Sequence, residues 1–381
     1  MEAINQNPVF YEFMAQMAYH RNVPDVYSWV SNYAIRRYGL EAPEVSSESK
    51  NSLLIAWKQL YENNYNGENP FCSLVCWDRA SLITGEPTWA ALQERTTLAG
   101  PLVDIWTLFL SAKLPNSWEN RAFTYDLVDI GRQVMSNLFN DYFHFTKAFY
   151  NRSDVRNYQI FMNELLQLIS QWDQLLSTHE SYLVGKWVSE AVRWAIDDQE
   201  RELFAYNAKN QITLWGPNGE ISDYASKNWA GLVKEYYLPR WKLFLTMSFE
   251  ALLKHQQIDQ DNFEEYELDL GRSFCNTSIP FGTEAIGCPI KLSEEFLLLY
   301  GNGYQSIHHY ERLENQSFEG LIINYEEQPT WTSNINQLKR LCDLIQECVG
   351  FTSQGLLKSS FASLVPNQNG ITSYLKKRST L

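Results

Sequence analysis

Apolar residues recur along most of the chain with the period of an α-helix. Over residues 24–39, apolar positions 26, 29, 30 and 33 share one helix face, with a proline near the start and a glycine just past the end. Longer patterns of this kind cover about residues 122–150 and 185–207, and another begins near Ser153 or Asp154. Each such helix has one apolar stripe that must pack against a neighbour, so the pattern predicts an all-α fold with a large helical domain.

One short segment departs from the helical period. Residues 211–215 alternate and are prone to form a strand, Gly216–Gly219 has the composition of a turn, and residues 220–222 can form a short return. We therefore predict one short β-hairpin within the helical domain. Asp223 follows it and can cap a long helix that continues through Trp241, which Pro239 should kink or break.

The periodic pattern weakens after about residue 304. A helix is expected around Asn336–Val349. The last residues, Tyr374–Leu381, have the polar composition of a frayed terminus. The fold of this last part is left open by the pattern.

Composition limits the partners that this chain can have. Hydrophobic residues make up 45% of the 381 residues, which is enough for a sizeable core. The 31 Lys and Arg against 45 Asp and Glu give a net charge of −14, which repels phosphate backbones, so we expect no nucleic acid partner. Apolar runs are too short to span a bilayer and no basic amphipathic stripe is present, so we expect no membrane partner.

Short motifs give little support to the common enzyme classes. The sequence contains no GxGxxG, Walker A, HExxH or GxSxG motif, and its six cysteines lack zinc-ligand spacing. We therefore predict no cofactor and no metal. Sequons at Asn151, Asn276 and Asn315 permit a secretory origin without establishing one. Aromatic residues, 14% of the chain, either fill the helical core or line a cleft for a sugar-like ligand.

Several longer stretches, in the same order and at similar separations, resemble segments of glycoside hydrolase family 89, the α-N-acetylglucosaminidases. They are Met1–Tyr11, Arg79–Leu82, Tyr125–Gln133, Leu183–Trp187, Ile212–Ala225, Ala230–Leu232 and Tyr236–Trp241. The resemblance covers about residues 1–300, and its most specific part is Ile212–Ala225. It implies an enzyme in which a (β/α)8 barrel is followed by an all-α domain, with the pocket between the two.

On this resemblance the chain divides into three parts. Residues 1–23 are expected to be a remnant of the catalytic barrel, residues 24–304 the C-terminal α-helical domain, and residues 305–381 a divergent tail. The remaining N-terminal barrel portion of the same enzyme is then an expected partner of this chain.

The resemblance implies the removal of terminal α-linked N-acetylglucosamine from glycans of the heparan sulfate type. Such a retaining glycosidase uses two carboxylates about 5–5.5 Å apart, one as nucleophile and one as proton donor. The resemblance gives the nucleophile role to Glu2, whereas the proton donor of the family lies upstream, so the chain alone is expected to be inactive. It also places substrate contacts at Trp215, Ile221 and Tyr224, where an aromatic face, an apolar contact and a hydroxyl can meet a sugar ring.

The chain also departs from the family pattern. Ala3 replaces a glycine often found after the nucleophile, and residues after about 304 do not resemble the family. The alternative function is a non-catalytic helical module that binds a carbohydrate or a protein. For Trp215 itself, the alternative to a sugar contact is that its side chain plugs the end of a helix bundle. The resemblance implies a lysosomal or secreted protein, although no signal peptide is visible after Met1. Structural roles, as ion pairs or caps on helices, are expected for Arg79, Asp126, Asp129 and Arg132.

Overall fold

The structure, a computed structural model, describes residues 8–65, 102–223, 225, 227–306, 309–314, 316–318, 322–323, 334–360, 364–366 and 371–377. Helices dominate it, which confirms the predicted helical class. The α-helices are α1 (Pro8–Met17), α2 (Val26–Tyr38), α3 (Ser47–Leu60), α5 (Leu102–Ser111), α6 (Arg121–Asn151), α7 (Val155–Ser177), α8 (Val184–Val192), α9 (Asp198–Gln211), α10 (Leu238–Leu253), α11 (Gln260–Asn276), α12 (Pro289–Tyr300) and α13 (Ile335–Leu344). Shorter turns are the π-helical η2 (Tyr61–Tyr65) and η4 (Val233–Tyr237) and the 3-10 turn η3 (Glu180–Tyr182).

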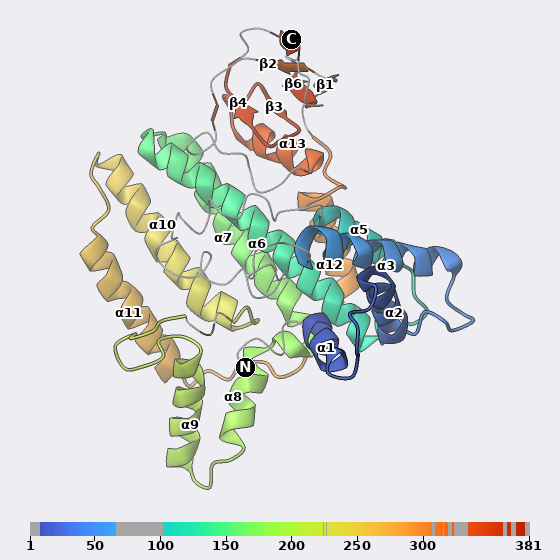
Figure 1. The fold of residues 1–381 in the computed structure, drawn as a ribbon. Helices are drawn as coiled ribbons and strands as arrows, with labels where there is room; N and C mark the ends of the chain where they lie inside the picture. Colours follow the sequence, from blue (N-terminus) through green and yellow to red (C-terminus); the bar gives the residue numbers. More distant parts are fainter. Residues whose placement is uncertain are drawn as a thin grey trace.

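The long helices α6 and α7 form the centre of the molecule (Figure 1). Helices α10 and α11 lie on one side of this pair, and α2, α3, α5 and α12 lie on the other, while α8 and α9 project from one end as a helical hairpin. A continuous apolar core joins these layers, and some of its aromatic residues pack edge to face, as where Trp241 of α10 meets Phe139 and Phe143 of α6.

The predicted helix boundaries depend on capping residues that the structure confirms. Asp25 accepts a hydrogen bond from the Ser28 amide at the start of α2, and Gly39 ends that helix with a φ of 67°, which suits glycine. The helix predicted over 185–207 is wrong as one element. Asp197 has an extended backbone and caps a second helix, so the segment divides into α8 and α9.

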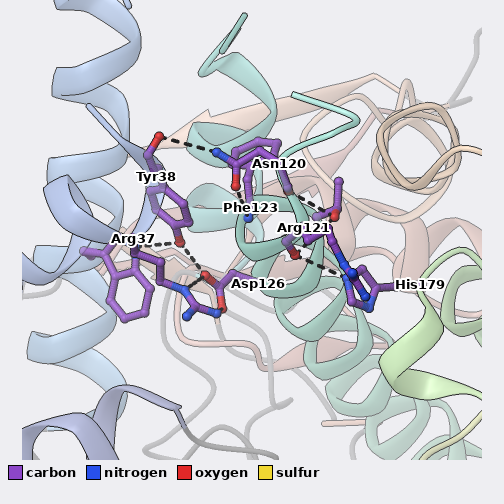
Figure 2. A network of polar contacts seen from close by, with 9 residues as sticks. Arg37, Tyr38, Asn120, Arg121, Phe123, Asp126 and His179 are labelled. Atoms are coloured by element: carbon purple, nitrogen blue, oxygen red, sulfur yellow. Dashed lines mark hydrogen bonds and ion pairs between the residues drawn. The ribbon is translucent and has the colours of Figure 1, made fainter. Parts of the chain in front are cut away.

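A polar network fastens α2 to α6 inside the core (Figure 2). Asp126 accepts two hydrogen bonds from the Arg37 guanidinium, one at 2.9 Å, and another from the Tyr38 hydroxyl. The Asp129–Arg132 pair, 3.0 Å apart, lies one turn further along α6. These contacts agree with the structural roles expected for Asp126, Asp129 and Arg132, whereas Arg79 lies outside the described residues.

The β-hairpin predicted over residues 211–222 is wrong. Helix α9 continues to Gln211, and the following residues form successive turns without strand pairing. Ile212, Thr213 and Leu214 are all buried, which an alternating strand with one exposed face does not allow. The Thr213 hydroxyl donates to the Lys209 carbonyl at 2.8 Å, so local bonds replace a strand ladder.

The tail forms small antiparallel sheets beside α13. Its strands are β1 (Tyr310–Leu313), β2 (Gln316–Phe318), β3 (Gly350–Thr352), β4 (Leu357–Lys358), β5 (Leu364–Pro366) and β6 (Ser373–Lys376). One sheet has the order β1-β6-β3-β4, and the other pairs β2 with β5. Because β6 pairs with strands on both sides, the frayed end predicted from residue 374 is wrong for residues 374–376.

The tail packs onto the helical domain through charged contacts. Arg340 of α13 forms an ion pair with Glu164 of α7 at 2.6 Å and donates to the Tyr142 hydroxyl of α6 at 2.8 Å. The expected helix near residue 336 is confirmed, but it ends at Leu344. A disulfide between Cys342 and Cys348 then connects α13 to the start of the sheet.

Candidate functional site

A compact series of turns, residues 212–223, follows α9 and carries two of the predicted sugar contacts. Its first reversal is held by Asn210, whose side chain accepts from the Gly216 amide at 2.8 Å and donates to the Gly216 carbonyl at 2.9 Å. The Trp215 amide donates to the Asn210 carbonyl at 2.7 Å. Trp215 has a φ of 48°, and its side chain is half-buried, so the indole is held at the surface by a constrained backbone.

The underside of this segment, which we call the Trp215 turn, packs against α11. A Cβ atom added to Gly271 would lie 2.5 Å from the Leu214 side chain, so only glycine allows this close approach of helix and turn. Lys209, at the end of α9, donates from its ammonium group to the Thr277 carbonyl at 2.6 Å. The turn is therefore fixed to two helices rather than only to its neighbours in sequence.

A buried cluster of charges lies at the end of the Trp215 turn. Nη1 of Arg240 contacts Oδ2 of Asp223 at 2.6 Å, Oε1 of Glu267 at 3.1 Å and the Tyr236 hydroxyl at 3.3 Å. The guanidinium also lies over the rings of Tyr236 and Tyr237, at 4.9 and 5.3 Å from their centroids. Asp223 and Arg240 are almost fully buried, so their ion pair is shielded from water, whereas the Glu267 side chain is 23% exposed.

The electrostatics of the cluster follow from its burial. Removal from water raises the pKa of the Asp223 and Glu267 carboxyls, and the positive charge of Arg240 opposes that rise. The Asp223 amide donates to the Thr213 carbonyl at 2.6 Å, and its φ is 59°. Arg240 thus holds the residue that closes the turn, and one cation is shared between two carboxylates.

The prediction that Asp223 caps a long helix is therefore wrong. Its side chain is paired with Arg240, and the next helical segment begins only at η4 and continues into α10. Pro239 is the second residue of α10 and directly follows the π-helical turn η4, so a local irregularity of the helix, of the kind expected at a proline, precedes it. The sequence motifs did not indicate the roles of Arg240 and Glu267. The available signal for Arg240 is a single cation within an otherwise uncharged stretch that contains three aromatic residues, Tyr236–Trp241.

The structure gives positions for two of the four predicted site residues, and the roles of all four as catalytic or sugar-contacting groups stay predictions. Trp215 and Ile221 lie on the same series of turns, and the Ile221 side chain is 46% exposed. Glu2 and Tyr224 lie outside the described residues, so their roles stay predictions.

Two kinds of feature are absent from the described part of the chain. No group of three or more His, Cys, Asp or Glu side chains there could hold a metal ion. Within those same ranges, no helix combines the length and the apolar character needed to cross a membrane.

The fold and the Trp215 turn define a class, namely a large helical domain that presents a rigid aromatic turn at its surface. The model of the "Alpha-N-acetylglucosaminidase (NAGLU) C-terminal domain" family matches residues 29–298. The chain belongs to this family. The tail lies beyond the match, as expected from its divergent sequence.

Known proteins support the same assignment. Human alpha-N-acetylglucosaminidase is 29% identical over 307 residues, which cover 78% of this chain and 39% of the human protein. A family 89 glycoside hydrolase from Clostridium perfringens, solved in complex with its substrate GlcNAc-α-1,4-galactose, has a TM-score of 0.61 at 22% identity, covering 77% of this chain and 33% of that chain. A structure of a family 89 glycoside hydrolase from the same organism, in complex with 2-acetamido-1,2-dideoxynojirmycin, has a TM-score of 0.62 at 23% identity and covers the same shares of the two chains. These structural similarities concern the fold.

Proposed function

We propose that this chain is the helical part of a retaining glycosidase that removes terminal α-linked N-acetylglucosamine, with glycans of the heparan sulfate type as its substrates. The observation that carries the proposal is the rigid Trp215 turn within the matched region 29–298. The human relative bears the name of this activity, and the bacterial neighbour was solved with a substrate that begins in GlcNAc.

The turn supplies one wall of the proposed sugar pocket. A half-buried indole can pack against the C–H face of a pyranose, and the exposed Ile221 adds apolar contact. Tyr224 would offer a hydroxyl to a sugar oxygen. The fixed backbone matters because a preformed wall loses little conformational entropy when the sugar binds.

Catalysis needs groups beyond this wall. In the proposal Glu2 is the nucleophile, and the general acid belongs to the barrel portion upstream in the family. General acid assistance is typically worth about 10²–10⁴-fold in rate. We therefore propose that the 381-residue chain alone is inactive, and that residues 1–23, 24–304 and 305–381 are the end of a barrel, the helical domain and an appended tail.

We further propose that the protein is lysosomal or secreted. The Cys342–Cys348 disulfide supports an oxidising compartment, because cytosolic proteins rarely keep such bonds.

Sugar binding is tested by titrating the 381-residue chain with N-acetylglucosamine while tryptophan fluorescence is recorded. We expect a saturable change that is lost in Trp215→Phe. The matched control is Trp118→Phe, since Trp118 is 66% exposed and lies in another part of the chain. An unchanged response in Trp215→Phe would contradict the proposed wall. Binding without catalysis in any form of the enzyme would favour the non-catalytic module.

Catalysis is tested with a chromogenic α-N-acetylglucosaminide. We expect no turnover by the chain alone and turnover when the upstream barrel sequence is joined to it. Glu2→Gln in the joined protein should abolish that turnover, because the amide cannot form the glycosyl-enzyme intermediate. Activity of the 381-residue chain by itself would refute the proposal that its inactivity follows from the lack of a general acid.

A further inference from the structure

A cavity lies beside α11, on a different face of this helix from the one that packs against the Trp215 turn. It has a volume of about 500 Å³ and is bordered by α7, η4, α10, α11 and residues 277–286. Leu270 and Phe274 of α11 line it, whereas Gly271 and Cys275 face the Trp215 turn. Its volume is in the range of small-molecule sites.

The segment that closes the cavity is held by two glycines. A Cβ atom on Gly185 would lie 2.1 Å from the Gly282 carbonyl oxygen, and one on Gly231 would lie 2.7 Å from Val184 and 3.1 Å from Phe281. No side chain fits at either position without movement of backbone or core. The cavity wall is therefore a defined part of the fold.

Asp173 of α7 supplies a carboxylate to this cavity and is only 9% exposed. Its Oδ1 accepts from the Gly231 amide at 2.7 Å and from the Lys234 amide at 3.1 Å. Its Oδ2 receives no hydrogen bond from any residue that the structure describes. Burial raises the pKa of Asp173, and the two amides oppose the rise. Asp173 is thus a mostly buried carboxylate that lines the cavity and has one oxygen that accepts no hydrogen bond from the described residues.

The charges around the cavity favour a cation. Three carboxylates, of Asp173, Glu235 and Glu284, line it with one ammonium group, that of Lys234. Lys234 and Glu235 lie 3.6 Å apart with half-exposed side chains. They belong to the π-helical turn η4, and single π-turns often occur at functional sites. A net charge of −2 repels anions and attracts an amine.

Apolar groups form most of the remaining lining, together with the hydroxyl residues Ser177, Ser273 and Thr277. The rings of Phe274 and Phe281 lie 5.6 Å apart at 46° to each other, and Pro239 and Leu270 are among the other apolar residues of the cavity. A compact apolar body can bury its surface here while a charged group reaches the carboxylate.

We propose that this cavity binds an organic primary amine with a compact apolar body. The ammonium group donates to Oδ2 of Asp173, and the body packs against Phe274 and Phe281. This site does not depend on the function proposed for the Trp215 turn.

The probe is cyclohexylamine, with cyclohexanol as its neutral counterpart, and binding to the 381-residue chain is measured by calorimetry. We expect the amine to bind at least tenfold more tightly than the alcohol. Asp173→Asn should remove that preference, because asparagine can still accept from both amides but carries no charge. The control is Glu250→Gln, an exposed acid of α10 that does not line the cavity.

Equal binding of amine and alcohol, no binding of either, or an unchanged preference in Asp173→Asn would overturn the proposal. A second measurement uses the unsubstituted protein, so its result does not depend on whether Asp173→Asn folds. With ¹³C-labelled aspartate carboxyls, saturating cyclohexylamine should lower the apparent pKa of one buried carboxyl, and cyclohexanol should not. Absence of that shift would equally overturn the site.

Discussion

The charge cluster beneath the Trp215 turn allows a quantitative test of what holds that turn. In Arg240→Met a side chain of similar length replaces the guanidinium, so the packing against Tyr236 and Tyr237 is largely kept. The change leaves Asp223 and Glu267 without their shared cation, and both Arg240 and Asp223 are almost fully buried.

The expected loss of stability follows from the dehydration of these charges. Removing one partner of a buried ion pair typically costs about 3–5 kcal/mol, because the remaining charge is uncompensated. We expect about 4 kcal/mol here. In the triple variant Arg240→Met, Asp223→Asn, Glu267→Gln no charge remains, so its stability should return to within about 1–2 kcal/mol of the parent.

Urea unfolding followed by tryptophan fluorescence measures both values. The free energy of unfolding typically falls by about 1–3 kcal/mol per M urea, and a chain of this size should lie near the upper end of that range. The urea midpoint of Arg240→Met should therefore fall by about 1 M. The control is Arg272→Met on α11, whose ion pair with Asp269 at 3.5 Å is exposed and should change stability by less than about 0.5 kcal/mol. A loss below about 1 kcal/mol in Arg240→Met, or an equal loss in the triple variant, would refute this reasoning.

Three further predictions concern other parts of the fold. Gly185→Ala should lower stability by about 1–3 kcal/mol, because its Cβ would lie 2.1 Å from the backbone oxygen of Gly282; an unchanged unfolding midpoint would contradict this contact. Replacing both Cys342 and Cys348 by serine should cost about 2 kcal/mol, measured as faster proteolysis of the tail while the helical domain resists. Burial raises the pKa of Asp173 in the folded protein above the ordinary carboxyl pKa of 3.8. The contribution of this group to stability is therefore greatest below pH 3.8 and is lost as the pH rises through the folded-state pKa. In thermal melts, the parent should gain stability relative to Asp173→Asn as the pH falls from about 7 to about 4.5.

The helical layers were predictable because one apolar stripe and local caps determine each helix. Residues 24–39 contain the apolar period, and the glycine at position 39 adopts the left-handed conformation needed to end α2. Asp154 likewise caps α7 through the Asn157 amide. Such signals lie within a few residues of the elements they define, so the sequence alone contains them.

The Trp215 turn was predicted as a hairpin because its residues have high strand propensity and a turn composition. Propensity could not reveal that Thr213 and Gly216 bond back onto the end of α9, or that Gly271, far along the chain, admits Leu214. The family resemblance identified the segment correctly as part of the matched region, but it did not give the conformation.

Asp223 shows the same limit for electrostatics. An aspartate before an apolar stretch is typical of a helix cap, and that interpretation needs no information from distant residues. Its actual partner is Arg240 of α10, which also pairs with Glu267 of α11, and a pairing over this distance leaves no periodic trace in the sequence.

The buried charges also explain why the helical domain can present a turn that is both exposed and fixed. A surface turn held only by its own hydrogen bonds would exchange among conformers, since each such bond contributes little net free energy in water. Here Asp223 closes the turn and is joined to two helices through one dehydrated cation, so opening the turn requires separating buried charges. The ion pairs of Arg240 therefore contribute both to the free energy of unfolding and to the fixed position of Trp215. A variant that weakens these ion pairs should lower the stability of the domain and also loosen the position of Trp215.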